Sequence, residues 1–219
     1  VHPGLLHTQA DFDRMKAKVA ANISPWIDGY NKLTSVVNLG YGPRAVSWIS
    51  RGKVYCGGDN GALLYRDVHN AYHAALIWKI TGDTQYADKA VAILNAWSYT
   101  LTSIGCAGGP TWDWVLLAGI QGYQFANVGE IMRNYTGWNQ TDFQAFQSMM
   151  LNQFYPINSG WLKYQFPLTS YANWPLCTTA SILAIGVLTD NQTIFNEALD
   201  YLKTGYTNGA LGKSIYFIH

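Results

Sequence analysis

The sequence predicts an all-α protein built from stacked antiparallel helical hairpins. Apolar residues recur near helical spacing through most of the chain, and polar or Gly-rich segments separate the helical stretches. Similar turn-like segments begin near Ile80, Tyr135 and Leu188, at intervals of roughly fifty residues, a period typical of helical hairpins stacked in a solenoid or an α/α toroid. We therefore expect a single all-α domain over residues 1–219.

The N-terminal part predicts two helices followed by a long loop. Thr8 with Asp11 three residues later is an N-terminal capping pattern, and the helix that it opens extends to about residue 21. A shorter helix follows over residues 25–34. Residues 37–60 are rich in glycine, so we expect a long loop there.

A strong helix is predicted over residues 62–81, because Leu64, Val68 and Tyr72 fall among apolar positions near helical spacing. Gly82-Asp83 ends this helix. The following helices are expected near 85–99, 113–133, 140–154, 172–188 and 192–204, and the longer loops between them at 103–111 and 155–171.

The composition fits one large domain with a substantial core and no strongly charged partner. Apolar residues make up 49% of the chain and the formal net charge is +1, so we expect neither a nucleic-acid nor a membrane partner. No apolar run is long enough to span a bilayer. The nine Trp and fifteen Tyr residues either fill the core or line a sugar-binding cleft, since flat aromatic rings pack on pyranose faces.

Four N-glycosylation sequons favour a secreted, extracellular protein. Their asparagines lie at predicted helix ends or connections, where a glycan can be carried: Asn22, Asn134, Asn139 and Asn191. An oxidising compartment would also permit a Cys56–Cys106 disulfide between two Gly-rich loops, leaving Cys177 as a buried thiol. Three unpaired thiols are the alternative.

In an array of hairpins the short turns gather at one end and the long loops at the other. The long loops carry side chains that suit a cleft for an extended polymer: Trp48, Arg51, Trp112, Trp161 and Tyr171. The helix over 172–188 opens at this end with Asn173 and Trp174. Polar groups at the mouth of a buried helix are costly unless they are paired or used, so these two are candidate site residues. Helix capping and core packing are their ordinary structural alternatives.

Several segments resemble secreted alginate-lyase-like proteins with an α/α toroid. They are His2-Pro-Gly-Leu-Leu-His-Thr-Gln-Ala-Asp-Phe, Trp78-Lys-Ile-Thr-Gly-Asp with the following Tyr86-Ala-Asp-Lys-Ala-Val-Ala-Ile-Leu-Asn-Ala-Trp, Leu117-Ala-Gly-Ile-Gln-Gly-Tyr-Gln-Phe-Ala-Asn, Asn173-Trp, and Ala184-Ile-Gly-Val with Asp190-Asn. Together they cover nearly the whole chain. The resemblance implies a polysaccharide lyase that acts on a uronic-acid polymer such as alginate or glucuronan.

Members of this family usually continue beyond the point where this chain stops, with a Gly-Arg-Asp-Gln-Gly-His-like motif and the last helices of the toroid. The resemblance therefore implies an incomplete α/α toroid that lacks its C-terminal part, and we expect that missing part to be its partner. The activity of such a fragment alone stays open.

The resemblance also implies the chemistry, which is removal of the C5 proton of a uronate and expulsion of the 4-linked oxygen. It assigns to the Asn173 amide the neutralisation of the substrate carboxylate. Several relatives carry a histidine after this asparagine, where Trp174 stands here, so the base must come from His73, His69 or Tyr171. The scheme needs neither a metal nor a cofactor.

Further residues are expected to contact the substrate. Trp174, Trp112 and Trp114 would stack on or wall the sugar, Arg51 could bind a carboxylate, and Tyr123 and Gln124 could line the interior of the ring or simply pack between helices. His69 and His73 lie four residues apart on one helical face, but no glutamate accompanies them as in zinc-binding His-Glu-x-x-His, so no metal site is predicted.

Two other functions remain open at this point. An α/α-toroid glycoside hydrolase would need two carboxylates across the sugar bond, and Asp59, Asp67 and Asp113 form no recognisable pair. A carbohydrate-binding helical protein without catalysis is the alternative from a different class.

Overall fold

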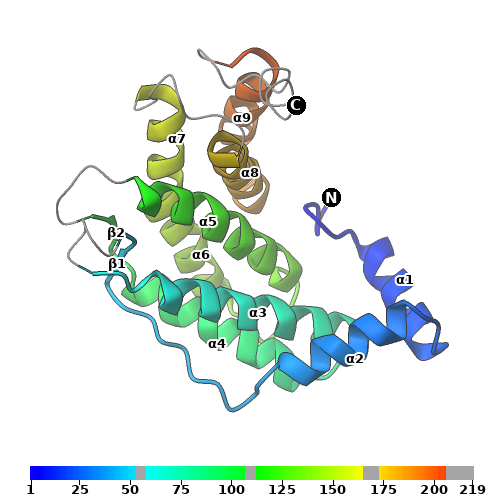
Figure 1. Ribbon diagram of the computed structural model, residues 1–219. Helices are drawn as coiled ribbons and strands as arrows, with labels where there is room; N and C mark the ends of the chain where they lie inside the picture. Colours follow the sequence, from blue (N-terminus) through cyan, green and yellow to red (C-terminus); the bar gives the residue numbers. More distant parts are fainter. Residues whose placement is uncertain (53–57, 107–111, 165–172, 206–219) are drawn as a thin grey trace.

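The computed structural model describes residues 1–52, 58–106, 112–164 and 173–205 (Figure 1). The all-α prediction is confirmed: helices dominate, and the only strands in these ranges are β1 (Trp48–Ser50) and β2 (Ser103–Gly105). The helices are α1 (Gln9–Ala20), α2 (Trp26–Val36), α3 (Gly61–Thr81), α4 (Thr84–Thr100), α5 (Asp113–Met132), α6 (Gln140–Met149), α7 (Tyr155–Tyr164), α8 (Asn173–Leu188) and α9 (Gln192–Thr204), with a π-helical segment, η1 (Met150–Phe154), between α6 and α7.

Three of these helices, α3, α5 and α8, pack side by side and run in the same direction. Gly119 of α5 lies against Thr178 of α8, and Gly129 lies against Leu188, so the two contacts are separated by the same interval on both helices. Near the start of α3, Gly61 packs against Leu117 of α5. The missing side chains of the glycines allow the two backbones of α5 and α8 to approach closely.

This common direction places the short turns after α3, α5 and α8 at one end of the array and the long connections at the other, as the sequence predicted. Gly82 ends α3 in the left-handed conformation, with φ of 80°, that favours glycine. The connections at the opposite end include β1 and β2, which pair in parallel through Ile49 and Ile104. The hairpin pattern is present, while closure into a toroid and its missing part stay predictions.

The sequence prediction was wrong for part of the long loop at 155–171, because residues 155–164 form α7. Pro156 lies near the start of this helix, where proline removes one helical hydrogen bond and its ring crowds the preceding turn. The wider turn of η1 directly precedes it and carries the helical path on from α6. The short strands were missed as well, because Gly-rich surroundings hid their pairing.

Asp67 fastens the connection before β1 to the helical core. Its carboxylate is fully buried and accepts hydrogen bonds from the Arg44 backbone N–H at 2.7 Å, the Trp97 indole at 2.8 Å and the Tyr41 hydroxyl. Buried carboxylates are tolerated when their oxygens are satisfied in this way. Asp67 is therefore a structural group that joins residues 41–44 to α3 and α4.

The asparagines of the four sequons lie at helix ends or turns. Asn22, Asn134 and Asn139 are exposed, and Asn191 is half-buried at the N-cap of α9. Cys177 is a free, half-buried thiol, whereas Cys56 lies outside the described residues, so the disulfide, the glycans and secretion stay predictions. None of the described helices combines the length and apolar character that a membrane span requires.

Candidate active site

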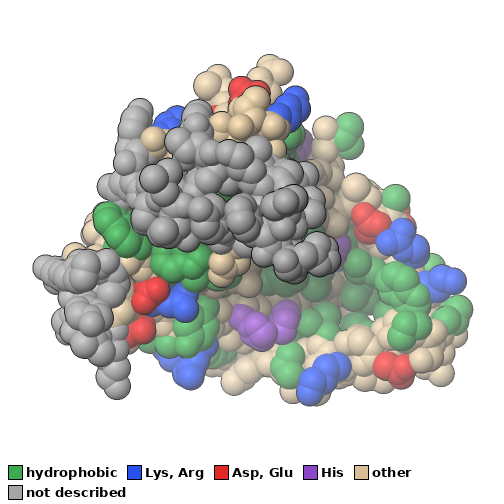
Figure 2. Space-filling view, turned by 45° about the horizontal axis from the view of Figure 1, so that its top comes forward, with side chains coloured by type: hydrophobic (Ala, Val, Ile, Leu, Met, Phe, Trp, Pro, Cys, Tyr) green, Lys and Arg blue, Asp and Glu red, His purple; other side chains and the backbone are tan. Residues whose placement is uncertain are grey.

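A polar pocket of about 290 Å³ opens between α3 and α5. Histidine surface lies in a hollow near the centre of the face shown in Figure 2. The size of the pocket suits a small ligand. Its walls are formed by Leu6, His69, Tyr72, His73, Tyr123, Gln124 and Asn127.

Helical spacing explains why these side chains meet. His69, Tyr72 and His73 occupy positions i, i+3 and i+4 on one face of α3, and Tyr123 and Asn127 are four residues apart on α5. Because the two helices pack side by side, their polar faces enclose one space. The sequence analysis had identified the two histidines, Tyr123 and Gln124, but not the packing that brings them together.

Three lining residues were missed by the sequence reasoning. Tyr72 was counted among the apolar positions of its helix, although its spacing from His69 placed it on the same face. Asn127 is not part of any sequence pattern that indicates a binding or catalytic role. Leu6 belongs to the N-terminal segment, and its backbone N–H donates to Asn127 Oδ1 at 3.1 Å. Nothing in the sequence near either residue predicts this contact.

His73 is neutral at ordinary pH. Burial lowers its pKa to about 4, and repulsion from His69, whose ring centroid lies 3.9 Å away, adds to the shift. Its Nδ1 is buried and has no hydrogen-bond partner among the described residues. A neutral imidazole in such a place can accept a proton from a bound ligand.

The two phenols of the pocket are proton donors rather than bases at neutral pH. Burial raises the pKa of Tyr72 to about 12, with a smaller contribution from Tyr123, and burial also raises the pKa of Tyr123. The Tyr72 hydroxyl lies 2.7 Å from His7 Nε2, in hydrogen-bond contact. The pocket therefore combines one neutral base with protonated hydroxyls.

Gln124 is the carboxamide that a ligand could use. Its Oε1 accepts a hydrogen bond from Gln121 Nε2 at 3.1 Å, and its own NH₂ group makes no hydrogen bond within the described ranges. Both polar atoms of the Asn127 amide already make hydrogen bonds, because Oδ1 accepts from the Leu6 backbone N–H and Nδ2 donates to the Tyr123 carbonyl at 2.9 Å. Asn127 therefore supports the wall, while Gln124 has donors left for an anionic group.

The predicted tryptophans form a cluster of their own at the loop end. Trp112 lies 6.0 Å from Trp114 and 5.5 Å from Trp161, and Trp161 lies 5.6 Å from Trp174, measured between ring centroids. Trp112 stays partly exposed, while Trp161 is almost completely buried. We name these four residues the tryptophan cluster.

Asn173 belongs to this end of the molecule. It is exposed in the first turn of α8. The packing of α5 on α8, with Gly119 against Thr178, places Asn173 at the same height along the helices as Trp114. Trp114 lies nine positions before Tyr123 on α5, and at 1.5 Å per residue this separates Asn173 from the height of Tyr123 by about 14 Å along the helix axis. Asn173, Trp174, Trp112, Trp114 and half-buried Arg51 do not line the histidine pocket. Tyr171 lies outside the described residues.

A comparison with profiles of known protein families matches residues 55–213 to the family described as alginate lyase. The match covers well over half of the sequence. The chain belongs to the alginate lyase family. It is therefore a polysaccharide lyase, and its substrate is a polysaccharide. A search of curated proteins finds no match.

The pocket of this alginate lyase family member differs from a hydrolase site. None of its described lining residues is a carboxylate, whereas hydrolysis of a glycosidic bond generally uses two. Of the three aspartates considered from the sequence, Asp67 is buried in its structural role, Asp59 is exposed beside Gly61, and Asp113 lies in the first turn of α5. Within the described ranges no three potential metal ligands come together.

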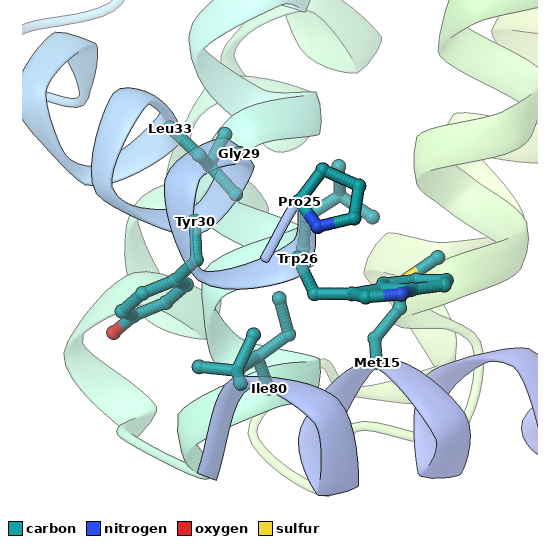
Figure 3. A pocket seen from close by; sticks show the side chains of 9 residues that line it. Met15, Pro25, Trp26, Gly29, Tyr30, Leu33 and Ile80 are labelled. Atoms are coloured by element: carbon teal, nitrogen blue, oxygen red, sulfur yellow. The ribbon is translucent and has the colours of Figure 1, made fainter. Parts of the chain in front are cut away.

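A second pocket, of about 340 Å³, lies between α1, α2 and α3 and is almost entirely apolar (Figure 3). Met15, Trp26, Tyr30 and Ile80 are among the side chains that surround it. Its described lining residues include the phenol of Tyr30 but no histidine, lysine, arginine or carboxylate that could act as a base. The chemistry of a lyase therefore points to the histidine pocket, although the apolar one is larger.

Proposed function

We propose that the chain cleaves a uronic-acid polymer, alginate or glucuronan, by β-elimination, and that the reacting uronate binds in the pocket between α3 and α5. The observation that supports this most is His73, a neutral imidazole held beside protonated phenols in a small polar pocket. Elimination needs a base and a proton donor, but no pair of carboxylates.

In this reaction His73 takes the proton from C5 of the uronate. The electron pair of the C–H bond forms the C4–C5 double bond, the bond from C4 to the glycosidic oxygen breaks, and a phenol protonates the departing oxygen. Charge develops on the uronate carboxylate during proton removal, and hydrogen-bond donors directed at it lower the barrier. Gln124, whose NH₂ group makes no hydrogen bond to the described residues, is proposed for this role.

Asn173 is proposed to bind a neighbouring sugar of the same polymer. The sequence assigned to it the carboxylate of the reacting unit, but its level on α8 matches the tryptophan cluster rather than His73. A polymer lying along α5 would pass from the histidine pocket to Asn173 and the exposed ring of Trp112. Aromatic stacking and an amide suit an acidic sugar there.

Incubation with alginate, glucuronan and hyaluronan tests the proposal, with neutral amylose as control. The unsaturated uronate product is followed by its ultraviolet absorbance, and new reducing ends are counted in parallel. We expect both signals to rise together on at least one uronan and neither on amylose. Reducing ends without absorbance would indicate hydrolysis and overturn the proposal, and so would the absence of both signals on every uronan.

On the acid side of its pH profile, kcat/KM should be lost only at an unusually low pH. Since protonated His73 cannot act as a base, kcat/KM is expected to fall as the pH drops through about 4, the lowered pKa, rather than near the ordinary value of 6.5. Short oligouronates should serve as substrate, because polymeric uronans lose solubility in acid. Substitution His69→Ala removes the repulsion and should move the limb to higher pH. An acid limb near 6.5 in the unmodified protein would contradict this assignment.

A further inference from the structure

We propose that Tyr72 and His7 form a catalytic pair in the pocket, in which Tyr72 protonates the departing sugar oxygen and His7, on the N-terminal segment, positions the phenol. The inference rests on the proposed function and extends it to a segment that precedes the first helix. Tyr72 would be a catalytic residue, since it touches the substrate. His7 would be a positioning residue.

The N-terminal segment is fixed against the helices that form the pocket. His2 Nδ1 lies 2.7 Å from the buried Glu130 of α5, and its Nε2 lies 2.8 Å from Asp190 after α8. Further along, Leu6 is bonded to Asn127 and lines the pocket. Contacts at both ends of this short segment hold His7 beside α3.

The bond between His7 Nε2 and the Tyr72 hydroxyl, 2.7 Å long, can orient the phenol for donation. Burial lowers the pKa of His7, so its ring is neutral and carries a single N–H. With this proton on Nε2, the ring donates to the phenol oxygen and leaves the Tyr72 O–H free for a ligand. After proton transfer, the same N–H stabilises the phenolate.

The proton balance closes with His73 as the other partner. His73 gains the C5 proton and becomes an imidazolium, while Tyr72 loses its proton to the glycosidic oxygen and becomes a phenolate. Transfer of the proton from His73 to Tyr72, directly or through water, restores both groups after product release. Tyr72 follows His69 and precedes His73 on the same face of α3, so donor and base belong to one wall of the pocket.

Tyr123 is the other phenol of the pocket. Within the described part of the chain no histidine is bonded to its hydroxyl, whereas Tyr72 has His7. A side-chain hydrogen bond from Asn127 opposes the rise of the Tyr123 pKa, but an amide cannot take up or return a proton. His7 can both donate to the phenol oxygen of Tyr72 and stabilise its phenolate, so we assign the donor role to Tyr72.

The first experiment compares Tyr72→Phe with Tyr65→Phe, a change to an exposed tyrosine on the same helix. We expect Tyr72→Phe to lower kcat on oligouronates by about 10²-fold with little change in KM, as for loss of a general acid, and Tyr65→Phe to behave as the unmodified protein. On a synthetic uronide with a nitrophenolate leaving group at C4, which departs without a proton, the defect of Tyr72→Phe should largely disappear. An equal defect on both substrates would overturn the role of Tyr72.

The second experiment tests His7. We expect His7→Ala to lower kcat by about tenfold or more through loss of orientation, and His7→Gln, or added imidazole with His7→Ala, to restore part of it. Nitrogen NMR of the His7 ring should show the proton on Nε2. Unchanged kcat in His7→Ala, or a proton on Nδ1, would overturn the positioning role.

The outcomes separate this inference from the function on which it rests. Elimination that requires His73 but proceeds normally in Tyr72→Phe would overturn the pair and leave the proposed function intact. Absence of unsaturated product from every uronan with the unmodified protein would overturn both.

Discussion

Replacing His73 by alanine is expected to lower kcat for uronan elimination by about 10²–10⁴-fold, the usual contribution of a general base. The change removes the pocket-lining histidine whose pKa burial lowers to about 4. It should spare the fold, because His73 is half-buried and its Nδ1 has no hydrogen-bond partner in the described part of the chain. Initial rates on oligouronates, with thermal unfolding of the same sample, measure the two effects separately.

The companion variant His69→Ala distinguishes the base from its neighbour. His69 is exposed and acts on His73 through charge repulsion, so its loss should cost less kcat than the loss of His73. Turnover by His73→Ala at the unmodified rate would show that the base lies elsewhere. A folded but inactive His73→Ala protein is the result that the pocket geometry requires.

Replacing Asp67 by leucine is expected to lower the free energy of unfolding by about 3–5 kcal/mol, as when one partner of a buried charged network is removed. Leucine has the same branched shape but is larger and accepts no hydrogen bonds. The indole N–H of Trp97, which is fully buried, and the backbone N–H of Arg44 would lose their acceptor. Buried donors without partners carry the full cost of their lost hydration.

Urea unfolding followed by circular dichroism measures this loss. Asp67→Asn keeps one acceptor oxygen and should fall between the unmodified protein and Asp67→Leu. Asp200→Leu, a change to an exposed aspartate of α9, serves as the surface control and should shift stability by about 0.5 kcal/mol or less. Equal stabilities of Asp67→Leu and the control would contradict the structural role of this carboxylate.

The helices were predictable because their signals are local. Periodic apolar residues and the capping pattern at Thr8 identified α1, and Gly82 identified the end of α3. The continuation of the chain through Pro156 depended on the wider turn of η1, which has no simple sequence signature. Pairing of β1 with β2 likewise depended on two segments far apart in sequence.

The candidate site could be predicted only in part, for the same reason. His69, His73 and Gln124 were identifiable as polar groups on helices, but their meeting depends on how α3 packs against α5. The contact between His7 and Tyr72 joins residues 65 positions apart, and nothing near either residue indicates it. Asn173 was placed at the loop end of α8 as expected, yet its level relative to His73 required the parallel packing of the helices.

The glycine contacts between α5 and α8 limit how this enzyme can adapt to its substrate. A methyl group on Gly122 would collide with Ser181 of α8, and one on Gly119 would crowd the backbone of Thr178, so α5 and α8 are in direct contact along this interface. Sliding or separation of α5 from α8 would open voids along the whole contact. Any induced fit around a sugar must therefore come from the opposite wall, through small shifts of α3 or of the N-terminal segment, while α5 serves as the rigid reference.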